Sequence, residues 1–447
     1  MDVDRYGTAH TNADQRALAP FEDATHAVLA HRPNAGAALE AAIAFDPALV
    51  SAHALKGFAC LTLAREELFP AARSAAQAAR EAQRDKGDVT AAEAALVDAL
   101  ALGIDGRFGA AADRLHAFVA TDPHALLHLK LAQSLRFMVG DVAGMLADTR
   151  AILPAWDETR PGFGYLLGCH AFALEETGEF AAAETAGRRA VALAPDDAWG
   201  LHSVAHVYEM RGRTADGIGW IEAARPVWTG CNNFAFHMAW HLALFHLEAG
   251  DDARVLHLYD TEVRPRPTDD FRDMANAVSL LWRLELEGVA VGDRWEALAE
   301  VARRRRRDTT LAFAALHNLI ALVAAGDNAS ARELAAAMAE KAREETDQGD
   351  TIRAVGLDLA GVIVSFGSVP REAAALVALA PRLQNLGGSH AQRDVFVRTL
   401  ARAAADRGDR AALDRVLAAR RRLKCDDRFV ADLAACLDRR PGLLIHG

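Results

Sequence analysis

The sequence predicts an all-α solenoid, that is, a stack of helix pairs. Three observations predict this fold. Alanine and leucine dominate the 447 residues, aromatic residues make up only 6%, and strictly alternating runs of β-branched residues are nearly absent. Segments such as 179–195 carry apolar residues at i, i+3, i+4 and i+7, the period of an amphipathic helix. Glycines interrupt these segments at a nearly constant interval.

The interval between the turn glycines indicates the type of repeat. The glycines are Gly106, Gly140, Gly178, Gly212, Gly250, Gly326 and Gly408, and the first four gaps are 34, 38, 34 and 38 residues. A period of about 34 residues is typical of tetratricopeptide repeats. Relative to Gly178, that pattern's positions hold Phe180, Ala183, Ala190 and Pro195. Glycine enters a left-handed helix cap cheaply and proline ends the second helix. We therefore expect a tetratricopeptide-like, right-handed solenoid curled around a central groove.

We expect one domain over residues 1–447, with a minor break near 263–268 that is short enough to be a loop between repeats. The 50 basic and 61 acidic residues give a net charge of −11, which argues against a nucleic-acid binder. The opening residues do not form a secretory signal, and no apolar stretch is long enough to span a membrane. The cysteines are odd in number and without a CxxC pair, so we expect reduced, mostly buried thiols in the cytoplasm.

Two histidine pairs are the strongest candidates for a functional site. His202, His206 and Glu209 follow one another at i, i+4 and i+7, on one stripe of one helix. His237 and His241 form a second i, i+4 pair on the first helix of the next repeat. Counted from the turn glycines, these residues take positions that largely line the groove in proteins of tetratricopeptide type. This resemblance implies that both pairs lie on the concave face.

Two kinds of chemistry fit these five residues, which we take as the catalytic set. Imidazole pairs with a nearby carboxylate can hold zinc or a similar divalent transition metal, with His202, His206, His237 and His241 as ligands. Without metal, the same groups could act as general acid and base. The chain has no HExxH motif, because Glu209 follows the second histidine. His317 falls at an equivalent groove position, and Trp240 could wall an apolar pocket or belong to the core.

The sequence also resembles the tetratricopeptide repeat protein 38 family. The blocks that carry the resemblance are Phe45–Gly57, Ala171–Phe180, Pro195–Arg213, the Trp228–His241 region, Ser279–Trp295 and Gly387–Asp394. The chain departs from the family at Asn276, where an acidic residue is expected, and nearby Asp273 could supply that charge. The resemblance implies the fold over most of the chain and specifies no reaction. Its polar motif residues nevertheless point to a site rather than to a pure scaffold.

The block Gly387–Asp394, GGSHAQRD, offers further substrate-binding candidates. Arg393 could clamp a carboxylate, and His390 could act as an acid, a base or a hydrogen-bond donor. Gln392 and Asp394 complete this set, together with His317 and Trp240. Alternatively, the block caps a helix, with Ser389 and Gln392 forming a capping box. In the block SLLWRL the leucines should be core residues, with Arg283 paired to an acid.

Two functions remain open from the sequence. The first is an enzyme of hydrolase or lyase type that acts on a small polar or carboxylated molecule, with the histidines and Glu209 as its working groups. No nucleotide-binding or α/β-hydrolase motif is present. The second is a non-catalytic tetratricopeptide scaffold that binds a peptide or a partner protein in the same groove, as solenoids commonly do. A homodimer is compatible with either function.

Overall fold

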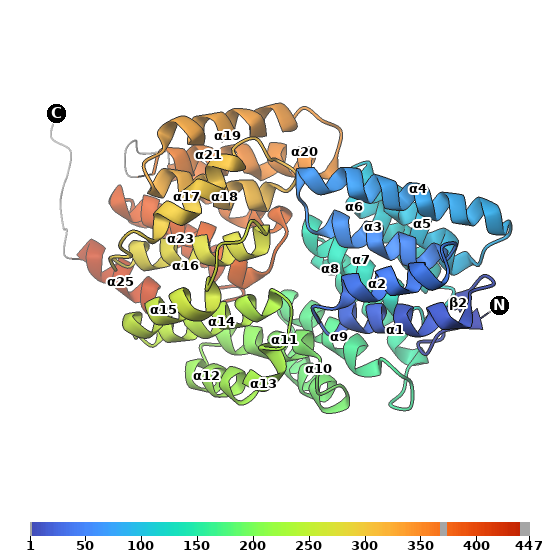
Figure 1. Ribbon diagram of the computed structural model, residues 1–447. Coiled ribbons are helices and arrows are strands. Elements are labelled where there is room, and N and C mark those ends of the chain that lie inside the picture. The colour runs from blue at the N-terminus through green and yellow to red at the C-terminus, as the bar shows by residue number, and fades with distance from the viewer. Residues whose placement is uncertain (1, 367–372, 439–447) are drawn as a thin grey trace. The chain divides into compact units, whose positions relative to one another are not determined.

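The computed structural model describes residues 2–366 and 373–438. Nearly all regular structure in these residues is helical, so the predicted all-α class is confirmed (Figure 1). The chain divides into two compact units. Unit 1 comprises residues up to Val207 together with Ala224–Ala235, and unit 2 comprises Tyr208–Ala223 and the residues from Phe236 on. The predicted minor break at 263–268 lies inside unit 2, in the segment before Phe271, where the next helix begins.

Unit 1 begins with a two-stranded antiparallel ribbon and continues in helices. Its elements are β1 (Asp2–Val3), β2 (Ala9–His10), α1 (Gln15–Leu29), α2 (Ala35–Phe45), α3 (Val50–Thr62), η1 (Glu66–Leu68), α4 (Phe69–Lys86), α5 (Ala91–Ile104), α6 (Phe108–Val119), α7 (Leu126–Val139), α8 (Val142–Ile152), η2 (Leu153–Ala155), α9 (Phe163–Glu176), α10 (Phe180–Leu193) and α13 (Arg225–Trp228). Two helices, α11 (Ala198–Met210) and α14 (Phe234–Glu248), begin in unit 1 and end in unit 2.

All regular structure in the described residues of unit 2 is helical. Its elements are α12 (Thr214–Ala223), α15 (Asp252–Leu258), η3 (Tyr259–Val263), α16 (Phe271–Leu286), α17 (Arg294–Arg304), α18 (Ala312–Ala324), α19 (Asn328–Lys341), α20 (Asp347–Thr351), η4 (Ile352–Gly356), α21 (Leu357–Val364), α22 (Ala373–Leu379), η5 (Ala380–Leu386), α23 (His390–Asp406), α24 (Arg410–Arg420) and α25 (Arg428–Asp438).

Helices that follow one another in the chain pack together in both units. In unit 1 the pairs include α1 with α2, α3 with α4, α5 with α6, and α9 with α10. In unit 2 they include α17 with α18, α18 with α19, and α23 with α24. The small residues that the repeat pattern places at packing positions, such as Ala111, Ala183 and Ala190, are fully buried. A methyl group there lets two helix backbones approach closely, so this packing confirms a solenoid of helix pairs.

The turn glycines have the backbone conformation that the sequence predicts. All seven have φ between 65° and 85°, a region that costs a residue with a Cβ atom about 1 kcal/mol or more. The predicted proline stop is also in place, since α10 ends at Leu193, just before Pro195. Local sequence alone therefore sets where each of these helices ends.

The cysteines follow the prediction only in part. Cys169 and Cys231 are buried free thiols, whereas Cys60 is half-buried and Cys425 is exposed. The side chain of Cys436 lies outside the described residues. The expectation of mostly buried thiols therefore fails at Cys425.

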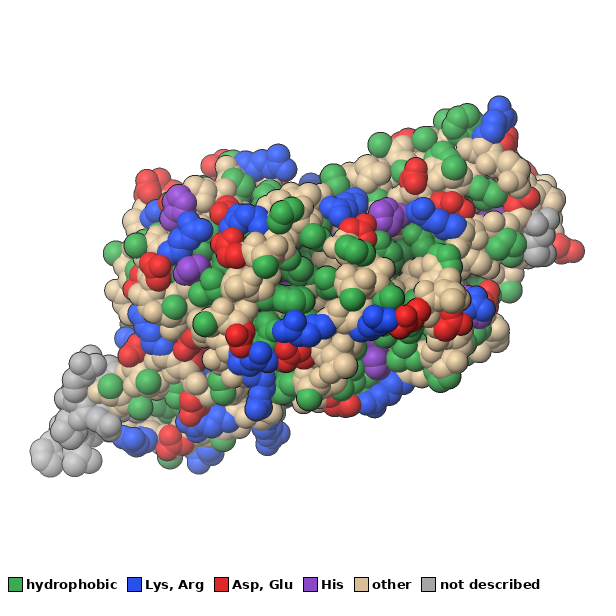
Figure 2. Space-filling view, turned by 90° about the horizontal axis from the view of Figure 1, so that it is seen from below, with side chains coloured by type: hydrophobic (Ala, Val, Ile, Leu, Met, Phe, Trp, Pro, Cys, Tyr) green, Lys and Arg blue, Asp and Glu red, His purple; other side chains and the backbone are tan. Residues whose placement is uncertain are grey.

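Opposite charges are mixed on the surface. On the face shown in Figure 2, Lys and Arg side chains alternate with Asp and Glu side chains. The five consecutive arginines 303–307 follow the same rule, because each has a carboxylate partner within 4.0 Å; these partners are Asp269, Glu300, Asp308, Asp327 and Glu333. Within the described ranges, no helix combines the length and the apolar character needed to cross a bilayer.

Candidate metal-binding histidine pairs

Helix α11 places the first histidine pair on a single stripe, as the spacing predicts. His202 and His206 belong to unit 1 and are buried. Their Nε2 atoms face one another at 2.8 Å. One helical turn separates the two residues, so the helix itself holds the rings at this distance.

Two carboxylates from α9 lie beside this pair. Nδ1 of His206 is 3.4 Å from Oε2 of Glu175. Glu175, Glu176 and His206 are all buried, and each offers one ligand atom within 4.8 Å of those of the other two. The sequence analysis did not select these two glutamates. They stand just before the turn glycine Gly178, at the end of the first helix of their repeat, and that position was the available signal.

Aromatic side chains surround the first pair within unit 1. The ring of His202 stacks on Phe172 at 5.7 Å and lies 5.0 Å from Trp199 and 5.3 Å from Phe234. The ammonium of Lys130 lies 4.7 Å from the centre of the Trp199 ring. Rings of this size exclude water, and hydrogen bonds and charges act more strongly where the local dielectric is low.

The second pair lies on α14 in unit 2. Nε2 of His237 and Nε2 of His241 face one another at 3.2 Å. Nδ1 of His237 is 3.0 Å from Oδ1 of Asn276, and Nδ1 of His241 is 3.2 Å from Oε2 of Glu209. The outer nitrogen of each ring therefore has a polar partner, while the inner nitrogens meet.

The outer contacts decide which ring nitrogens carry protons in the second pair. A carboxylate only accepts hydrogen bonds, so Nδ1 of His241 donates to Glu209. In this orientation of the amide of Asn276, Nδ1 of His237 also donates. Two neutral rings would then present lone pairs to one another at 3.2 Å. A cation between them, either a shared proton or a metal ion, removes this repulsion.

The negative charge of Glu209 is offset by a buried lysine. Its Oε1 accepts a 2.8 Å hydrogen bond from the ammonium of Lys424, which is also buried and lies 3.8 Å from Asp394. Asp394 belongs to the GGSHAQRD block. Within unit 2, successive contacts from Asp394 to Lys424, to Glu209 and to His241 therefore connect this block with the second histidine pair.

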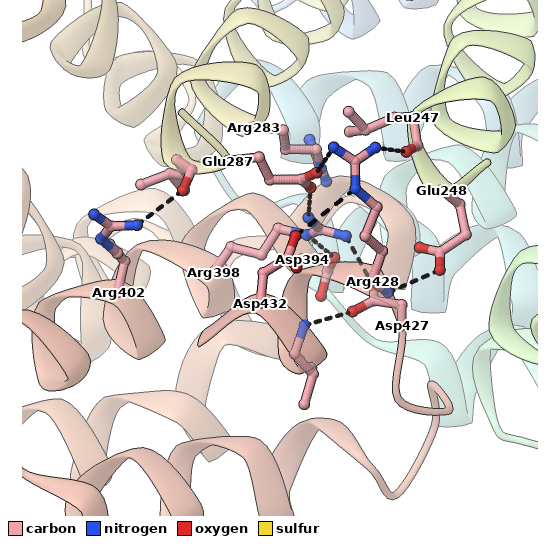
Figure 3. Close-up of polar contacts among 12 residues, drawn as sticks. Leu247, Glu248, Arg283, Glu287, Asp394, Arg398, Arg402, Asp427, Arg428 and Asp432 are labelled. Carbon is pink, nitrogen blue, oxygen red and sulfur yellow. Dashed lines mark hydrogen bonds and ion pairs between the residues drawn. The ribbon is translucent and has the colours of Figure 1, made fainter. Parts of the chain in front are cut away.

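Asp394 lies in a buried ionic network, drawn in part in Figure 3. Its carboxylate pairs with Arg398 at 2.9 Å and with Arg420 at 2.6 Å, and both arginines also pair with Asp427. Burial alone would raise the pKa of Asp394, but the charges of Arg420, Lys424 and Arg398 hold it well below its usual range. The network therefore keeps Asp394 ionised and joins α23 to α24.

The other residues of the GGSHAQRD block hold the start of α23. Ser389 and Gln392 form a capping box, which confirms that alternative of the sequence analysis. The guanidinium of Arg393 donates to the carbonyls of Gly387 and Gly388, and it lies 2.9 Å from Nδ1 of His390. These contacts order the loop before the helix, and a role for Gln392, Arg393 or His390 in binding substrate stays a prediction.

Trp240, His317 and Arg283 are buried in unit 2. Trp240 stacks on His237 at 5.3 Å and donates through Nε1 to Ser279. Nδ1 of His317 donates to the carbonyl of Phe313, and burial lowers the pKa of His317 to about 4, so the ring is neutral near pH 7. The leucines of SLLWRL are core residues as predicted. Arg283 makes no ion pair among the described residues, and the prediction that an acid pairs with it is wrong.

No family model matches the chain. The resemblance to the tetratricopeptide repeat protein 38 family and the meeting of the two pairs in one groove stay predictions. Each pair is formed as its spacing predicts, one in each unit.

Proposed function

We propose that this chain is a cytoplasmic metal-dependent enzyme of hydrolase or lyase type, whose histidine pairs bind a divalent transition metal through Nε2. The observation that carries the proposal is common to both pairs. Two Nε2 atoms face one another at 2.8 Å in the first pair and at 3.2 Å in the second. Ligands about 2.0–2.1 Å from a tetrahedral zinc ion lie roughly 3.3 Å apart, which matches the second pair, and the rings of the first pair would separate slightly around an ion.

The partners of the outer nitrogens support the same assignment. Metal-bound histidines usually give their second ring N–H to a carboxylate or a carbonyl, which fixes the tautomer and makes the ring a better ligand. Glu209 takes this place for His241 and the amide of Asn276 for His237. Oε2 of Glu175 lies 3.4 Å from Nδ1 of His206, an ion-pair contact on the same side of the ring. Imidazole ligands suit zinc, iron and copper, and the carboxylates beside the first pair also suit manganese.

When bound, such a metal would supply a Lewis acid and lower the pKa of bound water. The chain's own groups would hold the rings and move protons. Glu176 is buried within reach of His206, and we assign to it the role of general base or acid. Glu209 orients His241, because both of its oxygens already have partners. The aromatic rings around His202 would keep bulk water away from the first pair.

Burial of the histidines favours the enzyme over the peptide-binding scaffold. A groove that captures a peptide must present its polar side chains to the surface, whereas His202, His206 and His241 are almost fully buried. A buried polar site suits a small polar or carboxylated molecule better than an extended chain. The scaffold remains the alternative if no metal is found.

The test is the metal content of the purified, tag-free protein, measured by elemental mass spectrometry. Wild type is compared with His206→Ala and His241→Ala, and His317→Ala serves as the control because it also removes a buried histidine. We expect stoichiometric metal in wild type and in the control. If wild type holds one ion per chain and each of the two variants loses it, both pairs bind the same ion. Two ions, each lost in one variant only, would mean separate sites.

Absence of metal from wild type, both as purified and after incubation with zinc, manganese or iron(II), would overturn the metal proposal. Metal-free acid–base catalysis and the scaffold would then remain. A thermal-shift screen with small carboxylic acids and with peptides would distinguish these two, because a ligand that binds only the native state raises the melting temperature.

A further inference from the structure

Arg283 on α16 is a buried cation without an anionic partner. Arg283 is 1% exposed. The guanidinium donates to two backbone carbonyls, those of Ser279 at 3.1 Å and Ala391 at 2.6 Å. It makes no ion pair in the part of the chain that the structure describes. Burial lowers the pKa of Arg283 to about 10, which agrees with a charge that lacks compensation.

The nearby carboxylates are committed to other cations. Asp394 and Glu209 both act on Arg283 electrostatically. Asp394 pairs with Arg398 and Arg420, and Glu209 pairs with Lys424 and His241. Every other buried cation of this network thus has a carboxylate within 4.0 Å. Leaving one buried charge unpaired is costly, by several kcal/mol as an order of magnitude.

A second polar group on the same helix also lacks a partner. Asn276 is 1% exposed, and its Nδ2 makes no hydrogen bond within the described ranges. Asn276, Ser279 and Arg283 are spaced i, i+3 and i+7, which places them on one stripe of α16. A buried N–H group without an acceptor costs about 1–3 kcal/mol. The stripe therefore offers a cation and a donor, and both call for an acceptor oxygen.

Trp240 provides a flat wall beside this stripe. The guanidinium carbon of Arg283 lies 5.4 Å from the centre of the Trp240 ring, and Trp240 donates to Ser279 of the stripe. His317, whose pKa the charge of Arg283 lowers further, is neutral and adds no second positive charge. A ligand at this position would meet one cation, one amide donor and an aromatic face.

We propose that Arg283 and Asn276 bind a small oxyanion, a carboxylate or a phosphate, inside unit 2. A carboxylate and a phosphate each present two or more oxygens, and the planar fork of a guanidinium suits such acceptors. One oxygen would accept from Arg283 and another from Nδ2 of Asn276. The anion site shares Asn276 with the proposed metal site, where its Oδ1 faces Nδ1 of His237. It uses the other amide atom, Nδ2, and none of its contacts involves a metal-binding Nε2 atom of the histidines.

The experiment titrates the full-length protein with sodium acetate and with inorganic phosphate in an amine buffer whose only other anion is chloride. Sodium chloride keeps the ionic strength constant, and calorimetry and the melting temperature are recorded. Four proteins are compared: wild type, Arg283→Met, Asn276→Asp and the control Arg402→Met. Arg402 is an arginine of α23 that also donates to a carbonyl of α16, that of Leu286.

We expect saturable binding of one of the two anions to wild type and to the control. Binding should weaken about 10–100-fold in R283M, the range for a hydrogen bond to a charged group. N276D keeps the arginine and should weaken binding by repulsion, which covers the case in which R283M does not fold. Response to acetate alone identifies a carboxylate site, and response to phosphate alone a phosphate site. No saturable response in wild type, or equal responses in wild type and N276D, would overturn the proposal.

Discussion

The two histidine pairs have the same spacing and the same inner contact, but their surroundings differ. In unit 1, His206 stands beside two buried carboxylates, Glu175 and Glu176. In unit 2, His241 stands beside one carboxylate, Glu209, which also accepts from Lys424.

This difference shows what an i, i+4 pair determines and what it leaves open. Helix geometry brings the two rings together in both units, because one turn separates them. The charge beside the rings comes from other helices, and it differs between the units. We therefore expect the first pair to attract a metal cation more strongly, and the second to depend on the ion pair between Lys424 and Glu209.

The largest effect is expected from Lys424→Met, which removes the cation next to the second pair. Glu209 would then lose the ammonium that offsets its charge, and breaking a buried ion pair in this way costs about 3–5 kcal/mol. Urea unfolding measures the loss. Lys56→Met, at the exposed pair with Glu40, is the matched control and should cost less than about 1 kcal/mol. Equal losses in the two variants would contradict a buried role for Lys424.

The stability of the protein should depend on pH through a buried acid of unit 1, Asp197. Asp197 precedes α11 and accepts a hydrogen bond from the backbone N–H of Trp199. Burial raises the pKa of Asp197 to about 7, so the native state holds this proton more tightly than the unfolded chain does. Stability contributed by this group therefore falls as pH rises from about 4 to about 7.

Asp197→Asn keeps the capping oxygen and removes the titration. We expect the variant to be more stable than wild type at pH 8, by on the order of 4 kcal/mol, and the gain to vanish near pH 4. Urea unfolding at both pH values measures it. A gain of the same size at both values would refute the assignment to Asp197.

The carboxylates beside the pairs should differ in their effect on metal binding. Glu175→Gln should weaken metal affinity about 10–100-fold, as is usual when the partner of a metal-bound histidine is changed. Glu209→Gln should have a smaller effect, because Lys424 already offsets the charge of Glu209. Competition with a chromophoric chelator gives both affinities. The comparison between the pairs fails if the two variants lose affinity equally.

The smallest effect is expected at the start of α23. Ser389→Ala removes the capping oxygen, and the loss of such a cap costs about 1 kcal/mol. Thermal unfolding measures this change. Metal affinity should stay at the wild-type value, because the capping box makes no contact with either histidine pair in the hydrogen bonds described. A change in metal affinity would assign the block a role in the site.

Much of the fold was determined locally by the sequence. The turn glycines, the apolar helix period, the two i, i+4 stripes and the capping box of Ser389 and Gln392 all depend on residues less than about two turns apart. Backbone geometry fixes such contacts whatever the rest of the chain does. For this reason the helix pairs and the histidine pairs could be predicted.

Tertiary structure alone decided which groups the histidines and Arg283 meet. Glu175 reaches His206 from another helix, and Lys424 reaches Glu209 across 215 residues of chain. Arg283 meets the carbonyl of Ala391 instead of an acid. Such partners depend on how distant helices pack and on how far burial strips water from a charge. No local pattern encodes the packing or the burial. The histidines could therefore be predicted from the sequence, whereas the charges beside them could not.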